Sequence, residues 1–415
     1  MIERIAILGG SSVYIPEFIL SVISHNLNIR EITLLGREER KLALVSRFCQ
    51  RLLDRSGFPC KVIPTTDVAE AVSGAKYIIN HIRVGGMQQR LQDEKLPIKL
   101  GMIGNDCLGA GGITSALRTL PVVLDLVEQI EKINPEATFI NLTNPMGMVM
   151  EALVRHSNLR AIGVSDLPGT YIRKIGKLMR MDANAIDVNY VGLNHMGWIQ
   201  DLKSDGASIM PNVLEAILKE SDEDFDRGLI ELFRMIPTRH VSLYFHRDTY
   251  FKEQTTSGRL RSEVLFEAEQ QILKLYEDES LTEVPELTRQ RNALWYEQTI
   301  LPMLTALEFG AERPIICCIQ NGDAIRDLPP NCSVEVPVRV GPDAIEARQV
   351  GNCPRFLKGL FLTVKECDSL VVKAVKHKSY EYALQALAIN PLVPSLETAR
   401  RYLDMVMKEE SLDLH

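Results

Sequence analysis

The feature that most constrains the fold of this chain is a short turn near its start, rich in glycine and serine. An apolar segment, residues 5–8, runs directly into Gly9-Gly10-Ser11-Ser12, and an apolar helical pattern begins near Pro16. Proline is favoured in the first turn of a helix, where a missing N–H costs nothing. In dinucleotide-binding folds the same order of strand, tight turn and helix lets backbone N–H groups face a pyrophosphate. The turn therefore favours a nucleotide-binding α/β fold, with these four turn residues against the cofactor.

The turn is an incomplete match to the usual glycine pattern. Ser11 and Tyr14 stand where G-x-G-x-x-G has its second and third glycines. A plain strand–helix turn would look similar, so the turn alone leaves the two interpretations about equal. Its place at the first strand of a βαβ pattern favours the cofactor.

The end of the second predicted strand bears on which dinucleotide is bound. Dinucleotide folds usually carry a carboxylate there that accepts the hydroxyls of the adenosine ribose. This chain has Gly36 at that place, followed by Arg37, whose guanidinium could pair with a 2′-phosphate. A solvated arginine at the start of the next helix is the competing interpretation. The sequence predicts a nicotinamide dinucleotide, NAD with NADP left open.

Residues 1–168 alternate apolar, β-branched segments with amphipathic helical ones. This alternation is typical of a Rossmann-type α/β fold, a doubly wound parallel sheet with helices on both faces. The strands are expected at residues 4–8, 31–35, 61–64, 75–82, 138–142 and 161–164. The helices between them are expected at residues 16–24, 38–55, 68–72 and 114–132.

The pattern changes in residues 169–415, where helical segments dominate. The strand candidates are residues 187–191, 314–320 and 333–338. The helices are expected at residues 211–235, 263–277, 284–308, 355–388 and 394–409. We interpret this half as an α+β, helix-rich substrate-binding domain that packs on a dinucleotide-binding domain, residues 1–168.

Composition excludes several classes of protein. The net charge is −7 and no basic stripe is visible, which argues against a nucleic-acid partner. We expect no signal segment and no membrane span, because no uninterrupted apolar stretch is long enough. The eight cysteines are scattered without a C-x-x-C pair, as in reduced intracellular proteins. These observations predict a cytoplasmic protein.

Polar stretches follow several predicted strands, at the sheet edge where ligands bind in open α/β folds. They are residues 82–86, 104–112, 141–147, 163–168 and 192–195. Among them, the Arg-x-Gly-Gly at 83–86, the Asn-x-Thr-Asn-Pro at 141–145 and the Gly-x-Asn-His at 192–195 are the most informative. In this order, and together with the first turn, they resemble the family 4 glycoside hydrolases. These NAD- and metal-dependent enzymes include 6-phospho-glucosidases and α-galacturonidases and lie within the lactate/malate dehydrogenase-like superfamily.

The resemblance implies an unusual route to glycoside cleavage. Nicotinamide takes a hydride from C3 of the sugar, and the ketone so formed acidifies the proton on C2. A base removes that proton while a divalent metal, usually manganese, stabilises the negative charge. The group on C1 is then eliminated, water adds, and the hydride returns. The implied substrate is a glycoside or sugar phosphate with an anion at C6, and the implied assembly is a homodimer or homotetramer.

The resemblance assigns the metal to two positions. His195 matches the metal-binding histidine of the family, although a lone histidine is more often structural. Ser165 stands where the family carries a cysteine ligand, and a hydroxyl is a poorer ligand than a thiolate. Asp166 matches the aspartate that protonates the leaving group in α-acting members. A helix cap is the competing role for Asp166.

The base of the family is a tyrosine, and His240 stands at its place in this chain, with Tyr244 matching a later tyrosine. An imidazole titrates near neutrality and could act as the base, or it could bind a metal beside His195. Ser165 and His240 together indicate altered chemistry or an altered substrate. A catalytically inactive site would show the same two changes.

The remaining candidates are substrate contacts. Amide side chains can bind sugar hydroxyls, and the fork of an arginine suits a phosphate or a carboxylate. Arg83 is expected to contact the cofactor or the sugar, and each arginine could equally be a surface residue. The residues expected to contact substrate are Asn105, Asn144, Asn194, Arg261 and Arg291, with Arg289 as a further arginine beside them.

Two other functions are compatible with the same residues. A sugar or hydroxy-acid dehydrogenase or epimerase would use the same turn and would stop after oxidation. A catalytically divergent binding protein would keep the turn and lose the chemistry. The dehydrogenase would accumulate reduced nicotinamide, whereas a family 4 hydrolase recycles it.

Overall fold

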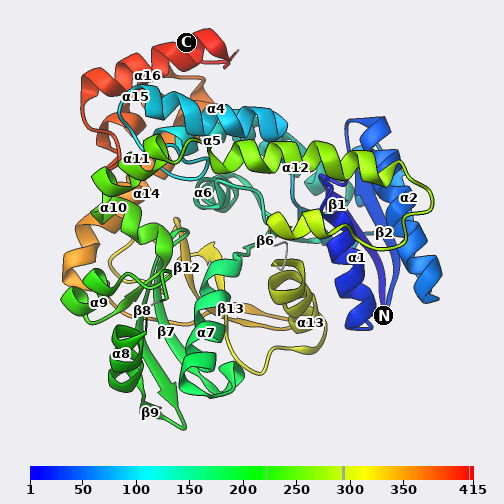
Figure 1. The fold of residues 1–415 in the computed structure, drawn as a ribbon, viewed down its shortest axis with the longest axis horizontal. Helices are drawn as coiled ribbons and strands as arrows, with labels where there is room; N and C mark the ends of the chain where they lie inside the picture. The colour runs from blue at the N-terminus through cyan, green and yellow to red at the C-terminus, as the bar shows by residue number, and fades with distance from the viewer. Residues whose placement is uncertain (221, 292–294, 411) are drawn as a thin grey trace.

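A computed structural model describes residues 1–220, 222–291, 295–410 and 412–415. Its centre is one long mixed β-sheet (Figure 1). The strands are β1 (Ile2–Leu8), β2 (Ile29–Leu35), β3 (Lys61–Thr65), β4 (Tyr77–Asn80), β5 (Thr138–Asn141), β6 (Arg160–Gly163), β7 (Asp187–Leu193), β8 (Met196–Ser204), β9 (Ala207–Ser208), β10 (Ile236–Pro237), β11 (Ile315–Gln320), β12 (Ser333–Val340) and β13 (Ile345–Ala347).

Sixteen α-helices are assigned in the described residues. They are α1 (Ile15–Ser24), α2 (Glu39–Ser56), α3 (Val68–Val72), α4 (Gly86–Lys99), α5 (Gly109–Ile133), α6 (Met146–His156), α7 (Asp166–Met179), α8 (Met210–Lys219), α9 (Arg227–Phe233), α10 (Ser242–Phe245), α11 (Arg247–Thr256), α12 (Arg261–Tyr276), α13 (Leu301–Phe309), α14 (Arg355–His377), α15 (Tyr380–Ile389) and α16 (Leu396–Glu409). A short 3₁₀ segment, Glu286–Gln290, and a π-helical segment, Tyr296–Ile300, lie between α12 and α13.

The first six strands form the parallel part of the sheet, in the order β3-β2-β1-β4-β5-β6. This is the strand order of a doubly wound dinucleotide fold, whose ligand crevice lies where the order reverses, between β1 and β4. The predicted Rossmann-type sheet is thereby confirmed. Beyond β6 the sheet continues antiparallel through β11, β12, β7, β8 and β10.

Side chains of β1 alternate between two helical layers. Ile5 and Ile7 pack in the core that contains Phe18 of α1, whereas Ala6 and Leu8 pack in the core that contains Ile113 of α5. Successive side chains of a strand point to opposite faces of the sheet, so a strand covered on both faces is apolar throughout. This double burial explains why β1 reads as a continuous apolar run.

Helices from the second half of the chain cover the first half. In Figure 1, α12 extends across the molecule to α2, and it contacts both α2 and α4. The helices α14, α15 and α16 pack against α5, and α14 also contacts α6. One sheet runs through both halves, so the division of the chain at residue 168 stays a prediction.

Several predicted helices are shorter than expected. The segment 211–235 contains α8 and α9, because Asp226 caps a new helix by accepting a hydrogen bond from the N–H of Leu229 at 3.1 Å. The segment 355–388 is divided at Lys378, whose φ of 51° ends α14 in a left-handed cap. Residues 292–294 of the predicted helix 284–308 lie outside the described residues. The sequence analysis also missed α4, α6 and β8.

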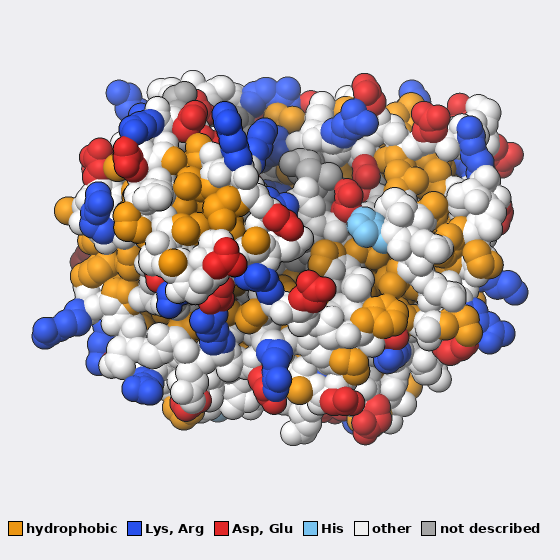
Figure 2. Space-filling view, turned by 90° about the horizontal axis from the view of Figure 1, so that it is seen from below, with side chains coloured by type: hydrophobic (Ala, Val, Ile, Leu, Met, Phe, Trp, Pro, Cys, Tyr) orange, Lys and Arg blue, Asp and Glu red, His pale blue; other side chains and the backbone are white. Residues whose placement is uncertain are grey.

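The charges on the surface are mixed. Figure 2 shows lysine, arginine and acidic side chains interspersed on the face seen from below, without a broad basic stripe. Among the described helices, α5 is long and apolar enough to cross a membrane by length and composition. However, 67% of its most apolar window is buried inside the protein. We therefore interpret α5 as a core helix.

Candidate active site

The glycine turn after β1 is held by contacts that leave no room for side chains. The N–H groups of Gly9 and Gly10 both donate to the carbonyl oxygen of Leu35, at 3.0 and 2.7 Å. A Cβ atom on Gly9 would lie 2.5 Å from the carbonyl oxygen of His81, and Gly9 has a φ of +95°. A Cβ on Gly10 would lie 2.6 Å from Cβ of Leu34. Glycine is therefore required at both positions, and the close approach of β1, β2 and β4 fits a cradle for a dinucleotide.

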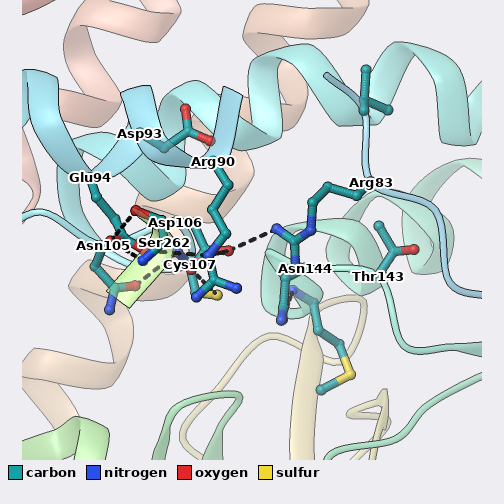
Figure 3. Close-up of polar contacts among 12 residues, drawn as sticks. Arg83, Arg90, Asp93, Glu94, Asn105, Asp106, Cys107, Thr143, Asn144 and Ser262 are labelled. Atoms are coloured by element: carbon teal, nitrogen blue, oxygen red, sulfur yellow. Dashed lines mark hydrogen bonds and ion pairs between the residues drawn. The ribbon is translucent and has the colours of Figure 1, made fainter. Parts of the chain in front are cut away.

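Figure 3 shows two arginines, Arg83 and Arg90, that converge on the carboxylate of Asp106. One terminal nitrogen of Arg83 lies 2.9 Å from Oδ2 of Asp106, and Nε of Arg90 lies 3.3 Å from the same oxygen. Arg90 also pairs with Glu94 at 3.3 Å. Burial alone would favour the protonated acid, but the two arginines outweigh it and hold the pKa of Asp106 well below its usual range. Asp106 is therefore an anion fixed inside the site.

Two asparagines predicted to bind substrate lie in this region. Asn105 accepts hydrogen bonds at Oδ1 from the N–H groups of Cys107 and Leu108, at 2.8 and 3.0 Å. Oδ1 of Asn144 accepts from the N–H of Met146 at 3.4 Å, and Figure 3 shows Asn144 beside Arg83. In both residues the amide oxygen stabilises a local turn by accepting hydrogen bonds from backbone N–H groups. Their Nδ2 groups donate to no other residue that the structure describes, so they are available to a hydroxyl.

His195 and His240 lie face to face. Their ring centroids are 4.1 Å apart with an angle of 24° between the planes. Burial lowers the pKa of His195 to about 4, and burial, His195 and Arg239 lower that of His240 well below its usual value. Both rings are therefore neutral near pH 7. Nδ1 of His240 is buried and has no hydrogen-bond partner among the described residues.

Ser165 acts as the N-cap of α7 and accepts from the N–H of Leu167 at 3.4 Å. Asp166 is exposed in the first turn of this helix, so the structure gives the capping role to Ser165. No group of three His, Cys, Asp or Glu side chains in the described residues is placed to hold a metal. The neutral ring of His195 fits a divalent ion, and the unpartnered Nδ1 of His240 could take either such an ion or a proton. Such an ion would take its other ligands from water or from substrate oxygens, as manganese commonly does.

A buried carboxyl group supports the loop that carries His195. Glu335 of β12 is 2% exposed and accepts hydrogen bonds from the Tyr190 hydroxyl and from Nδ2 of Asn194, the latter at 3.2 Å. Burial raises the pKa of Glu335 to about 7, although these two hydrogen bonds oppose the shift, and Asp166 adds to it. The predicted substrate residue Asn194 thus uses one of its amide protons inside the protein.

An arginine without a carboxylate partner lies beside the glycine turn. The guanidinium carbon of Arg291 lies 4.9 Å from the ring centroid of Tyr14 and 5.0 Å from that of Trp295. Burial lowers the pKa of Arg291 to about 10, and the charges of Arg83 and Arg90 act in the same direction. No carboxylate of the described residues is within ion-pair distance. The positive charge of Arg291 is therefore not neutralised by a described side chain, and a bound anion could neutralise it.

The other predicted arginines are more exposed. Arg261 is exposed at the start of α12 and donates to the carbonyl oxygen of Gln290. Arg289 is exposed and pairs with Glu286 at 3.3 Å. Arg37 is exposed just after β2. Burial raises the pKa of Tyr14 beside the turn, and the charges of Arg291 and Arg261 oppose that shift.

Tyr244 lies in a small pocket with Cys107, Asn194, Asp368 and Asn390. Burial raises the pKa of Tyr244 above its usual value, and Asp368 adds to the shift. Tyr244 is therefore a hydrogen-bond donor at neutral pH and not a base. His240 is unprotonated near pH 7 and can accept a proton, but its lowered pKa makes it a weak base in the absence of substrate.

The structure thus brings several of the predicted residues together. Arg83 contacts Asp106, whose charge acts on both His195 and His240, and Asn194 precedes His195. The sequence analysis missed three groups in this region: Asp106, Glu335 and Trp295. A signal existed for Glu335, because a lone acid stood in the otherwise apolar strand 333–338. Nothing in the sequence distinguished Asp106 from its polar neighbours.

Comparisons with known proteins agree with this picture. The family model described as family 4 glycosyl hydrolase matches residues 4–181, and the model of the family 4 glycosyl hydrolase C-terminal domain matches residues 190–393. The chain is 30% identical over 427 residues to a probable 6-phospho-beta-glucosidase of Bacillus subtilis (strain 168), covering 98% of this chain and 96% of that protein.

Two solved structures are similar over the whole chain. The 6-phospho-beta glucosidase from Thermotoga maritima, with manganese, NAD+ and glucose-6-phosphate, has a TM-score of 0.91 at 29% identity and covers 100% of both chains. A 6-phospho-alpha-glucosidase from gut microorganisms, in complex with NAD and glucose-6-phosphate, has a TM-score of 0.91 at 26% identity and covers 99% of both chains. The similar proteins therefore include both α- and β-glucosidases by name.

The raised pKa of Glu335 predicts a pH-dependent stability. The folded protein holds this proton up to about pH 7, whereas an unfolded glutamate loses it near its ordinary value of 4.5. Stability from this group is therefore present below about pH 4.5 and is lost as the pH rises to about 7. The side chain in Glu335→Gln cannot ionise. As the pH rises from 5 to 8, the free energy of unfolding of this variant should therefore increase by on the order of 1–3 kcal/mol relative to that of the wild type.

Urea denaturation at several pH values measures this difference. Glu346→Gln is the matched control, because Glu346 is exposed on β13 and pairs with Arg339. Its stability should follow the wild type at every pH. If the free energy of unfolding depends on pH in the same way for Glu335→Gln and for the wild type, Glu335 is ionised in the folded protein throughout this range, which contradicts the prediction.

Proposed function

Because the chain belongs to family 4 of the glycosyl hydrolases, we propose that it cleaves a 6-phosphorylated glucoside with a nicotinamide dinucleotide and a divalent metal. The observation that carries the proposal is the stacked pair of His195 and His240, which feels the charge of the buried Asp106. Asp106 in turn pairs with Arg83, which follows β4, the neighbour of β1 in the sheet. The names of the relatives supply the substrate class: the similar proteins named above are 6-phospho-glucosidases. The unpaired Arg291 supports an anionic substrate.

The groups that the chain would hold supply the oxidation. When bound, the dinucleotide would accept a hydride from C3 of the sugar and return it at the end, while the divalent ion would act as a Lewis acid. Gly9, Gly10, Ser11 and Ser12 would hold the dinucleotide, with Arg37 at its adenosine end and Arg83 near the sugar. His195 would hold the metal, together with the weak ligand Ser165.

The side chains of the site would then move the protons. Oxidation at C3 makes the C2 proton acidic, and we assign its removal to His240, whose neutral ring can accept it. Asp166, exposed at the start of α7, would protonate the oxygen that leaves C1. Tyr244 would donate a hydrogen bond to the substrate. Water addition and return of the hydride complete a hydrolysis in which the dinucleotide is not consumed.

The amides and arginines would orient the sugar. Asn105, Asn144 and Asn194 would contact its hydroxyls, and Arg261 and Arg291 its phosphate. The same proposal places the protein in the cytoplasm, where sugar phosphates and nicotinamide dinucleotides occur, and treats it as a homodimer or homotetramer.

Activity on a panel of aryl glucosides tests the proposal. The purified protein, supplied with NAD or NADP and with manganese, should release the aryl group from an α- or a β-glucoside 6-phosphate. The unphosphorylated glucoside should react at least about tenfold more slowly, since a lost charge-assisted contact costs about 1.5–3 kcal/mol. Chelation should abolish turnover. Turnover that persists without both dinucleotide and metal would refute the proposal, and steady accumulation of reduced nicotinamide would identify a dehydrogenase instead.

Replacement of the predicted base gives a second test. His240→Gln should lower kcat by about 10²–10⁴-fold, because a positioned base contributes that much, while dinucleotide affinity stays within about twofold. His246→Gln is the matched control, since His246 is half-exposed and bonds to Asp226 at 2.9 Å. Steady-state kinetics and dinucleotide titration measure the two effects. Equal losses of kcat in both variants, or none in His240→Gln, would exclude His240 as the base.

A further inference from the structure

The residues at the end of β2, Gly36 and Arg37, differ from those usual in an NAD site. In an NAD site a carboxylate at this place accepts the two ribose hydroxyls of adenosine. Here the place belongs to Gly36, and a Cβ atom on Gly36 would overlap the Ser11 hydroxyl. The N–H of Gly36 is also occupied, because it donates to the carbonyl oxygen of Thr65 at 3.1 Å. The Ser11 hydroxyl thus fills the space where the acceptor carboxylate of an NAD site would begin.

The charges around this point favour an anion. Arg37 follows Gly36, is exposed, and forms no ion pair with any described residue. The neighbouring charges are used elsewhere: Lys41 pairs with Glu38 at 3.0 Å, and Arg40 pairs with Glu277 at 2.7 Å. Three nearby acids of the described residues form no ion pair: Glu39 in the first turn of α2, Asp67, which caps α3, and Glu70, which accepts a hydrogen bond from the Thr65 hydroxyl. A free guanidinium next to a hydroxyl is a suitable partner for a phosphate.

We propose that the adenosine end of this site is built for a 2′-phosphate, so that the protein binds NADP(H) in preference to NAD(H). The Arg37 guanidinium would neutralise the phosphate, and the Ser11 hydroxyl would donate to it. The inference rests on the proposed function for the presence of a dinucleotide, and it adds which one. The NAD in the structures of the relatives belongs to those proteins and leaves this preference open.

Binding of NADP+ and NAD+ to the full chain, measured by titration calorimetry at low salt, tests the preference without turnover. NADP+ should bind about tenfold tighter or more, since charge-assisted hydrogen bonds contribute about that much. Arg37→Ala should weaken NADP+ binding about tenfold and change NAD+ binding by less than about twofold. Arg55→Ala, which removes the same charge from the last turn of α2, is the matched control and should change neither.

A variant designed to prefer NAD+ tests whether the Ser11 hydroxyl occupies the place of the ribose-binding carboxylate. Ser11→Gly combined with Gly36→Asp removes the hydroxyl that would overlap and adds a carboxylate, so it should reverse the preference toward NAD+. The pair 2′,5′-ADP and 5′-AMP reports the same contact without the nicotinamide half. The wild type should bind 2′,5′-ADP more tightly, and Arg37→Ala should remove the difference.

The outcomes separate this inference from the proposed function. Tighter or equal binding of NAD+ by the wild type, or an equal effect of Arg37→Ala on both dinucleotides, overturns the preference and leaves a dinucleotide enzyme. Selective loss of NAD+ affinity in Glu39→Gln would overturn it too, by identifying Glu39 as a ribose acceptor. Failure to bind either dinucleotide would overturn the inference together with the proposed function.

Discussion

The close approach of three chain segments at Gly9 and Gly10 is the constraint on which the rest of the site depends. Both N–H groups converge on one carbonyl oxygen of β2, while the backbone after β4 lies directly behind the turn. Any side chain at either glycine would push these segments apart. Because the segments stay together, the carboxyl ends of β1, β2 and β4 share an edge. The segment after β5 and the turn after β7 meet in space, since Pro145, Gly147 and Asn194 line one small pocket.

Burial acts on several ionisable groups of this site, and the neighbours decide whether each group is charged. Asp106 is buried and stays ionised because Arg83 and Arg90 contact it. Glu335 is buried without a cation, and its pKa rises to about 7. His195 and His240 are buried near each other, and both become neutral. Neutral imidazoles beside a fixed carboxylate form a site that can accept a proton or a cation.

Local patterns in the sequence predicted the parts that depend on nearby residues. The strand–turn–helix at Gly9, the six parallel strands and the edge that carries Asn144 and His195 all follow from short-range periodicity and turn chemistry. The resemblance of the motifs also predicted the family correctly. The long helical segments were less accurate, because caps at Asp226 and Lys378 divide them. The mainly polar residues 219–228 and 376–379 mark both breaks in the sequence and were not recognised as such.

Contacts between distant residues could not be predicted in this way. The partner of Asn194 is Glu335, and the rings that flank Arg291 include Tyr14. Such pairs are separated by well over one hundred residues, and only the folded chain brings them together. The role of Ser165 shows the same limit: its match to a cysteine ligand came from the sequence, whereas its capping of α7 became visible only in the structure.

The fate of the hydrogen on C2 tests the central claim most directly, because only an oxidation at C3 makes that hydrogen exchangeable. A glucoside 6-phosphate cleaved by the protein in D2O should yield a sugar phosphate with deuterium at C2, detected by NMR of the product. A substrate labelled with deuterium at C3 should keep its label, since the hydride returns to the same carbon. A product that retains its original C2 hydrogen in D2O would contradict the account, because the glycosidic bond would then have been cleaved without deprotonation.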